Sequence, residues 1–237
     1  MKKLLENSKN YLGYLEEWMR SLSPFRIDTS TSNPEQIAVM VVDMTDGFCS
    51  EGPLASPRMK HIVDPITSLL NEAWAFGVKQ IFLLNDTHEP NAVEFNSYPP
   101  HCIRGTQESL PIKEIRSLKF FDQLQLVPKN SISSNLNTVL GDSLKKFPKL
   151  EKFIVVGDCT DLCVYQLAMY LNLDANSKQI GHRQVIVPAN CIETYDLSVE
   201  LAKKIEAIPH PGNLLHAIFL HHMKLNGIEI VREVIFK

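Results

Sequence analysis

The chain has 237 residues, long for one average domain and short for two, so we expect a single domain with additional segments. Hydrophobic residues make up 44% and charged residues 22%, which is close to globular averages and excludes disorder as the main state. The net charge is −3 and the basic residues are scattered, which argues against nucleic-acid and membrane-surface partners and favours a small-molecule partner.

The N-terminus and the cysteines predict a soluble cytoplasmic protein. Two lysines follow Met1 as in a secretion signal, but Glu6, Ser8 and Asn10 interrupt the apolar run that such a signal needs. No run of about 18 apolar residues is present to span a bilayer. The five cysteines include no C-x-x-C pair and are an odd number, so they fit neither a disulfide framework nor a four-cysteine zinc site. We expect reduced thiols.

Residues 1–35 are predicted to be an added helix followed by a linker, and residues 36–237 to form the main domain. Leu4, Leu12, Leu15 and Trp18 recur at helical spacing, whereas residues 21–34 are rich in Ser, Thr and Pro. Short apolar runs then alternate with longer amphipathic stretches. The predicted strands are 37–42, 80–84, 124–127, 153–156, 184–187 and 228–231, and the predicted helices are 59–76, 134–147, 161–172, 198–205 and 213–225.

Unbroken β-branched runs separated by helices are typical of parallel strands buried on both faces. The sequence therefore predicts an α/β fold, a three-layer doubly wound sheet that is mainly parallel, has about six strands and carries helices on both faces. The chain contains only ten glycines and lacks the G-x-G-x-x-G, G-x-x-x-x-G-K-[ST] and G-x-S-x-G motifs, which argues against dinucleotide and P-loop chemistry.

Reactive side chains follow four of the predicted strands. Asp43 ends the first run, Asp86 and His88 follow the second, Lys129 follows the third, and residues 157–163 follow the fourth. In a parallel sheet the ligand crevice lies beyond the carboxyl ends of the strands, so these residues are expected at one edge. Any one of them alone is most often an exposed turn residue; their coincidence favours a site.

Cys163 is the candidate nucleophile. Thr160 is a candidate helix N-cap, which would place the thiol in the first helical turn, where the macrodipole and a nearby lysine lower the thiol pKa. The backbone N–H groups of Cys163 and Cys159 could then hold an oxyanion, and Asp43 and Lys129 supply acid–base and charge partners, an arrangement suited to acyl transfer. The alternative is a small buried packing residue, the commoner fate of a free cysteine.

Asp86, His88 and His101 form a candidate metal site. One carboxylate and two imidazoles can converge on a divalent cation while leaving positions open, and Glu94 in the intervening loop is a candidate fourth ligand. The alternative is that these histidines are ordinary loop residues. The C-terminal histidines have no carboxylate at ligand spacing and are expected to be solvated or packed: His210, His216, His221 and His222.

Several segments resemble the isochorismatase-like cysteine hydrolase family and, within it, nicotinamidases of the longer type found in plants and some bacteria. The similarity runs from about residue 37 to the C-terminus and is most specific in the G-x-x-T-D-x-C-V stretch at 157–164. The other matching stretches are 41–48, 86–90, 98–106, Lys129 and 207–211.

The resemblance implies roles for individual residues. Cys163 would be the nucleophile, Asp43 the proton shuttle and Lys129 their charge partner, with a cis peptide at Asp158–Cys159 and the Cys159 N–H in the oxyanion hole. The implied divalent metal is zinc, with iron or manganese as alternatives, and its implied ligands are Asp86, His88 and His101, joined in some relatives by Glu94. The rings of Phe48 and Tyr98 match positions that sandwich the substrate.

Together these features predict a metal-assisted amidohydrolase that converts nicotinamide and water to nicotinate and ammonia. Thr45 replaces the usual Gln, and the loop 88–101 lacks a His-x-Ser-Phe stretch, so the exact amide stays open. The alternatives are hydrolysis of a ureido or carbamoyl amide, or of an isochorismate-like vinyl ether, and a nonenzymatic scaffold that assembles through its N-terminal helix. We also expect a homo-oligomer.

Overall fold

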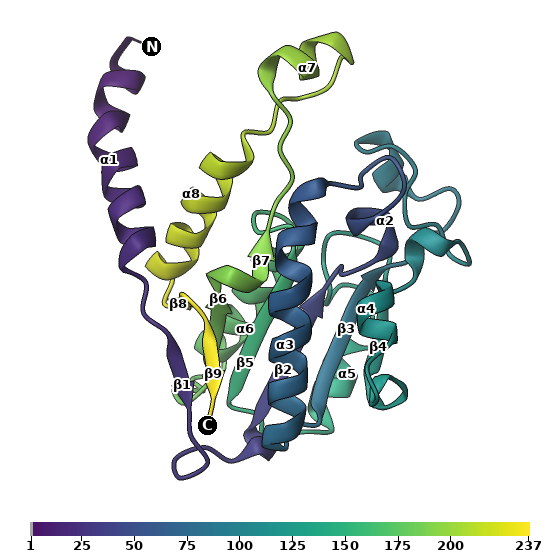
Figure 1. Ribbon diagram of the computed structural model, residues 1–237, viewed down its shortest axis with the longest axis vertical. Coiled ribbons are helices and arrows are strands. Elements are labelled where there is room, and N and C mark those ends of the chain that lie inside the picture. The colour runs from purple at the N-terminus through teal and green to yellow at the C-terminus, as the bar shows by residue number, and fades with distance from the viewer. Residues whose placement is uncertain (1) are drawn as a thin grey trace.

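The computed structural model describes residues 2–237 and contains a parallel sheet between two layers of helices (Figure 1). The strand order is β4-β3-β2-β5-β6-β8, with β7 pairing with β5, and every pairing is parallel. This confirms the predicted α/β fold. The strands are β2 (Ile37–Val42), β3 (Gln80–Asp86), β4 (Gln125–Lys129), β5 (Lys152–Asp158), β6 (Gln184–Pro188), β7 (Ile192–Glu193) and β8 (Glu229–Val231).

The helices largely follow the predicted stretches. They are α1 (Lys2–Ser21), α2 (Asp46–Cys49), α3 (Lys60–Phe76), α4 (Lys113–Arg116), α5 (Leu140–Lys145), α6 (Cys163–Ser177), α7 (Val199–Lys204) and α8 (Gly212–Leu225). The helix expected at 134–147 is reduced to α5, because Asn137 adopts a positive φ of 54° that a continuing helix does not allow. Pro65 is accommodated inside α3.

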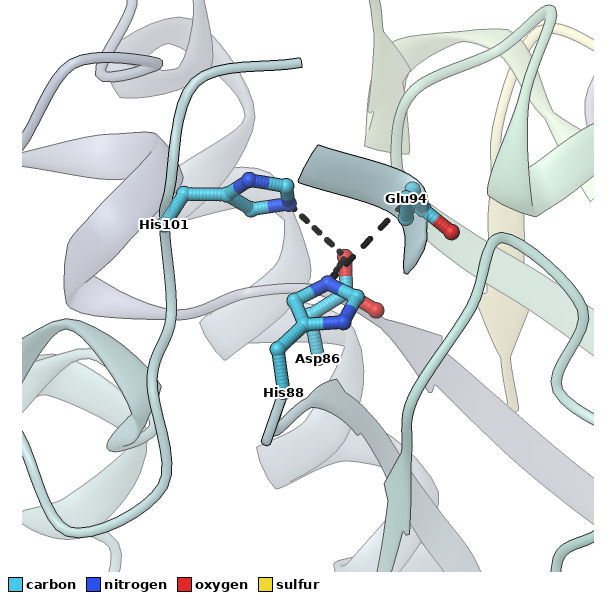
Figure 2. A group of neighbouring side chains, drawn as sticks. All are labelled: Asp86, His88, Glu94 and His101. Atoms are coloured by element: carbon cyan, nitrogen blue, oxygen red, sulfur yellow. Dashed lines mark ion pairs between the residues drawn. The ribbon is translucent and has the colours of Figure 1, made fainter. Parts of the chain in front are cut away.

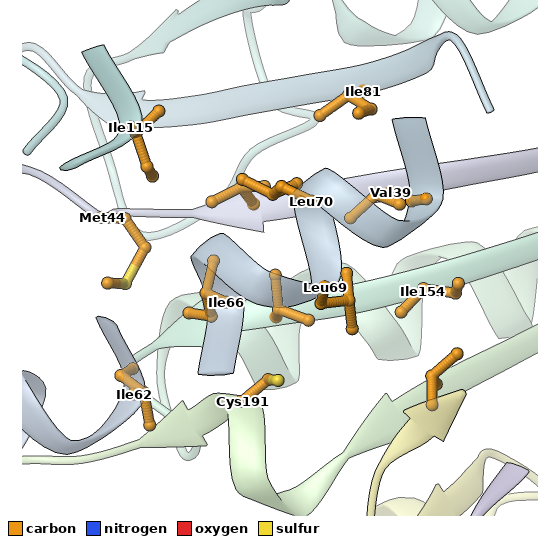
Figure 3. Packing of buried hydrophobic residues seen from close by; sticks show 14 of the residues in the cluster. Val39, Met44, Ile62, Ile66, Leu69, Leu70, Ile81, Ile115, Ile154 and Cys191 are labelled. Carbon is orange, nitrogen blue, oxygen red and sulfur yellow. The ribbon is translucent and has the colours of Figure 1, made fainter. Parts of the chain in front are cut away.

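The central strand β2 is buried on both faces because its side chains alternate between two cores. Val39 and Val41 pack beneath α3 and α4, whereas Met40 and Val42 face the core that α5, α6 and α8 cover. Figure 3 shows the first of these cores, with Ile66 of α3 lying over the sheet. Full burial of one such side chain stabilises the fold by roughly 1.5–3 kcal/mol. A strand that is buried on both faces therefore carries apolar residues at every position.

The N-terminal segment packs against the main domain at two places, whereas the sequence predicted a helix followed by a linker. α1 lies alongside α8 (Figure 1), where Leu15 is buried and the hydroxyl of Tyr11 is 2.9 Å from Nδ1 of His221. The expected linker then contains a strand, β1 (Phe25–Ile27), which pairs in parallel with β9 (Val234–Phe236) near the C-terminus. Among residues 2–237, no helix combines the length and apolar composition that crossing a membrane requires.

Candidate active site

The four strand ends named above meet at one edge of the sheet because β4, β3, β2 and β5 are neighbours. Asp86 on β3 pairs in register with Lys129 on β4. Asp43 follows β2 in a positive-φ conformation of 52°, and its Oδ1 accepts a 2.7 Å hydrogen bond from the backbone N–H of Asp86. The register of the sheet thus fixes these side chains beside one another.

The ammonium group of Lys129 joins the cluster. Its Nζ is 2.7 Å from Oδ2 of Asp43 and 2.5 Å from Oδ1 of Asp86, and it donates to Sγ of Cys163 at 3.5 Å. Lys129 is 1% exposed and both carboxylates are buried, so solvent contributes little to screening these interactions. One cation therefore contacts the thiol and both carboxylates.

The charges at this cluster are strongly perturbed. Burial, reinforced by the charge of Asp86, raises the pKa of Asp43 to about 6, although Lys129 opposes the shift. Burial favours the neutral amine of Lys129, but Asp43 and Asp86 outweigh it and hold the lysine pKa well above its ordinary value. Asp43 is therefore ionised at neutral pH and able to accept a proton.

Cys163 lies in the first turn of α6, as expected, but the helix begins at Cys163 itself and the surroundings of the thiol differ from the prediction. Burial raises the pKa of the Cys163 thiol well above its ordinary value, and the charge of Lys129 only opposes this, so the expected lowering was wrong. Thr160 is not the N-cap: Leu162 occupies that position without a side-chain cap, and the Thr160 hydroxyl lies 2.8 Å from Nδ1 of His216. The thiol therefore requires a base to become a thiolate.

The turn that presents Cys163 depends on Gly157 at the end of β5. Gly157 has a φ of 115°, and a Cβ atom there would lie 1.9 Å from the carbonyl oxygen of Val42, so a side chain cannot be accommodated. The following peptide, Asp158–Cys159, is cis, as the resemblance implied. The turn places the backbone amides of Cys159 and Cys163, the predicted oxyanion donors, at either end of one short loop.

The predicted metal ligands also converge (Figure 2). Asp86, His88, Glu94 and His101 each offer a ligand atom, and these atoms lie within 4.8 Å of one another. Oδ2 of Asp86 is 3.5 Å from Nε2 of His88 and 3.7 Å from Nε2 of His101, and Oε1 of Glu94 is 4.0 Å from Nε2 of His88. Asp86 thus faces Lys129 with one oxygen and this cluster with the other.

The two histidines are oriented as metal ligands are. Nδ1 of His101 donates to the carbonyl oxygen of Pro99 at 2.8 Å, and Nδ1 of His88 is 3.1 Å from the side-chain oxygen of Asn130. Such partners fix the tautomer with the proton on Nδ1 and leave Nε2 free to coordinate. Nε2 of His88 is buried without a hydrogen-bond partner among the described residues, so a divalent cation fits this group of donors.

The two predicted substrate-binding rings lie close to the metal-ligand cluster. Phe48 on α2 lies 5.5 Å from the ring of His101, and Tyr98 lies 6.3 Å from the same ring, measured between centroids. Phe48 is largely buried and Tyr98 half-buried. Both rings therefore lie beside His101 of the metal-ligand cluster.

One polar pair beside the nucleophile was missed at the sequence level. Asp161, two residues before Cys163, lies 2.7 Å from Nε2 of His210, a residue that was expected to be solvated or packed. The pair spans 49 residues and comes from different elements, so no local spacing reveals it. The remaining signal in the sequence was the position of Asp161 inside the G-x-x-T-D-x-C-V stretch.

Comparison with known proteins places this geometry in a family. The isochorismatase domain model matches residues 37–207. Nicotinamidase 1 of Arabidopsis thaliana is 27% identical over 215 residues, covering 85% of this chain and 87% of that protein. Ureidoacrylate amidohydrolase RutB of Rhizobium rhizogenes is 28% identical over 182 residues, covering 64% of this chain and 72% of that protein.

The fold is also found among solved structures. The pyrazinamidase of Pyrococcus horikoshii, crystallised in complex with zinc, superposes with a TM-score of 0.64 at 20% identity, covering 83% of this chain and 99% of that one. At this identity the likeness concerns the fold, whereas the domain match extends over most of the sequence. This chain belongs to the isochorismatase family of hydrolases.

Proposed function

We propose that this protein is a metal-assisted cysteine amidohydrolase that converts nicotinamide and water to nicotinate and ammonia. The observation that carries the proposal is the position of Lys129, which contacts Asp43 and Cys163 and also Asp86 of the metal-ligand cluster. A thiol, a carboxylate base and a possible cation site are thereby combined at one strand edge. Each group on its own has a structural explanation, but their combination matches a nucleophilic hydrolysis.

In the proposed first step, ionised Asp43 accepts the thiol proton and Sγ of Cys163 attacks the amide carbonyl carbon. The developing oxyanion is held by the backbone N–H groups of Cys159 and Cys163. Collapse of the tetrahedral intermediate breaks the C–N bond, and Asp43 returns the proton to the leaving ammonia. Lys129 stabilises the negative charge that moves between the carboxylate and the thiolate.

In the second step, a water molecule donates a proton to Asp43 and attacks the thioester carbonyl. The C–S bond then breaks, the acid product leaves, and the proton returns from Asp43 to Cys163. The pKa of Asp43, raised to about 6, suits both directions of proton transfer because the group can be ionised or protonated near neutral pH.

The ligands proposed for the metal are Asp86, His88, Glu94 and His101. A divalent cation, most simply zinc, would supply a Lewis acid that binds a heteroatom of the substrate ring away from the reacting carbonyl. Phe48 and Tyr98 would contact the faces of the ring. The metal-ligand cluster and the two rings would thus bind the substrate, whereas Cys163, Asp43 and Lys129 would cleave the bond.

Similarity to Nicotinamidase 1 and to the zinc-containing pyrazinamidase fold supports a pyridine-type amide as the substrate. Similarity to RutB supports the alternative, hydrolysis of a ureido or carbamoyl amide by the same three residues. Vinyl-ether hydrolysis and a nonenzymatic scaffold need neither the cysteine nor the four potential metal ligands, so both alternatives leave these residues unexplained. Homo-oligomerisation and a cytoplasmic location stay predictions.

The test is ammonia release from nicotinamide, pyrazinamide, ureidoacrylate and carbamoyl amides by the zinc-loaded protein, with isochorismate consumption followed separately. Cys163→Ala, prepared in parallel, is the matched control for contaminating amidases. We expect the highest kcat/KM with nicotinamide or pyrazinamide and no ammonia from the variant. A preference for ureidoacrylate would replace nicotinamide with the alternative substrate, and inactivity on the whole panel would contradict the proposed function.

A further inference from the structure

Two histidines near the C-terminus contact consecutive residues of the turn that presents Cys163. Nδ1 of His216 lies 2.8 Å from the hydroxyl of Thr160, and Nε2 of His210 lies 2.7 Å from Oδ2 of Asp161. The isochorismatase domain match ends at residue 207, so both histidines lie beyond it while their partners lie within it. The segment 208–216 therefore adds contacts to the turn from outside the matched domain.

The Asp161 carboxylate is fully engaged inside the protein. Its Oδ1 accepts a 2.6 Å hydrogen bond from the hydroxyl of Thr194, which is itself buried, and its Oδ2 faces His210. Asp161 is 8% exposed. Removing a partner of such a group leaves a buried polar atom unpaired, which costs more than the hydrogen bond itself contributes.

The imidazole of His210 is fixed on several sides. Nδ1 faces the carbonyl oxygen of Tyr195 at 2.9 Å, and because a carbonyl only accepts, Nδ1 carries a proton. A second proton must lie between Nε2 and Oδ2 of Asp161, since an unprotonated nitrogen and a carboxylate would repel each other. The Tyr195 ring stacks on the imidazole at 3.7 Å and 16°, and the backbone of His210 pairs with Leu197.

His216 is held in a similar way within α8. Burial lowers its pKa, so the ring is neutral and offers Thr160 one donor or acceptor nitrogen. The backbone N–H of Thr160 also donates to the carbonyl oxygen of Glu193 at 2.9 Å. Thr160 is thus bound through both backbone and side chain, and Asp161 through its side chain, three and two residues before the nucleophile.

We propose that His210 and His216 are positioning residues that hold the turn 157–163 in the geometry needed for hydrolysis, a role that rests on the proposed function. They do not touch the reacting atoms. Through Asp161 and Thr160 they fix the direction of the Cys163 thiol and of the Cys159 and Cys163 amides. A displacement of about 1 Å in such groups can lower a rate roughly a hundredfold, so losing either short hydrogen bond to the turn should slow the reaction.

The experiment combines steady-state kinetics with hydrogen exchange of the zinc-loaded full chain. His210→Ala and His216→Ala are compared with His222→Ala, a control on the exposed side of α8 whose Nδ1 lies near Tyr165 and Asn226. We expect the two positioning variants to lower kcat by roughly ten- to a hundredfold with KM changed by less than about threefold, and the control to keep wild-type values.

Exchange of the 157–163 amides should accelerate by about tenfold or more in the positioning variants, while the 153–156 amides of β5 stay protected. Asp161→Asn should keep kcat near the wild-type value, because an amide can still accept from Thr194 and donate to a neutral His210. Faster exchange with unchanged kcat, or no change in either, would overturn the proposal.

Two further arms keep the test decisive. If the alanine variants fail to fold, Thr160→Val removes the hydroxyl contact to His216 at nearly constant volume, and wild-type kcat in that variant would overturn the proposal. If the wild-type protein hydrolyses none of the amides, the proposed function fails on its own. Exchange at 157–163 then still decides whether the histidines hold the turn, and unchanged exchange contradicts it.

Discussion

Replacing Lys129 with methionine would leave the buried carboxylates of Asp43 and Asp86 without the cation that contacts both at 2.7 and 2.5 Å. Removing one partner of a buried ion pair costs about 3–5 kcal/mol of folding stability, because the remaining charge cannot be hydrated. In a chain of this length 1 kcal/mol corresponds to roughly 2–4 °C, so Lys129→Met should lower the Tm of the metal-free protein by about 6–20 °C.

The pH dependence of the stability loss shows whether the buried carboxylates cause it. Without Lys129 the folded-state pKa values of both carboxyls rise, so the stability loss relative to the wild type grows with pH as these groups ionise. In the wild-type protein, burial raises the pKa of Asp86, but Lys129 and the hydrogen bonds from His101 and His88 together outweigh burial and lower that pKa, which stabilises the fold above the unfolded pKa. The pKa of Asp43, raised to about 6, has the opposite effect: it lowers stability progressively as the pH rises from about 4 to about 6, and the loss persists above pH 6.

The assay is urea unfolding of metal-free wild-type protein, Lys129→Met and Lys145→Met at pH 4 and pH 7. Lys145 is the control because its side chain is 78% exposed, so its loss should change stability by less than about 0.5 kcal/mol. The difference between wild type and Lys129→Met should widen from pH 4 to pH 7. A loss below about 1 kcal/mol at pH 7, or one that does not vary with pH, would refute the assigned ion-pair energetics.

Three further outcomes are expected. Cys163→Ala should abolish turnover with the fold intact, and peptide mass analysis after iodoacetamide should show Cys163 alkylated before Cys49, because Lys129 contacts the Cys163 thiol and stabilises its thiolate; earlier labelling of Cys49 would contradict this. His88→Ala should lose about one equivalent of bound zinc by metal analysis and raise KM more than it lowers kcat, and full zinc retention would remove His88 from the ligand set. Tyr98→Ala should raise KM with little change in Tm, because its side chain is half-buried; an unchanged KM would exclude the ring from substrate binding.

The central sheet was predictable because its strands carry continuous apolar runs that only a sheet covered on both faces can bury. β2 begins and ends where the sequence indicated, at Ile37 and Val42. The short strands β1 and β9 were missed because each has three residues and they pair across the length of the chain. A contact of that kind is set by tertiary packing and leaves no local pattern.

The same distinction applies to the candidate site. The strand-end rule located Asp43, Asp86 and Lys129, since their positions follow from the parallel sheet. The rule does not predict that Cys163 is buried, and this burial reverses the expected direction of the thiol pKa shift. The role of His210 also depended on a long-range contact, because Asp161 comes from another element.

The most direct test of the central claim is a search for the covalent intermediate. Zinc-loaded protein is mixed with nicotinamide, quenched in acid within the turnover time, and digested for peptide mass analysis. The account predicts a nicotinoyl thioester on the peptide that contains Cys163, and no adduct in Cys163→Ala, which should release no ammonia. Ammonia release that persists in Cys163→Ala, or an acyl group found on a different residue, would contradict the account.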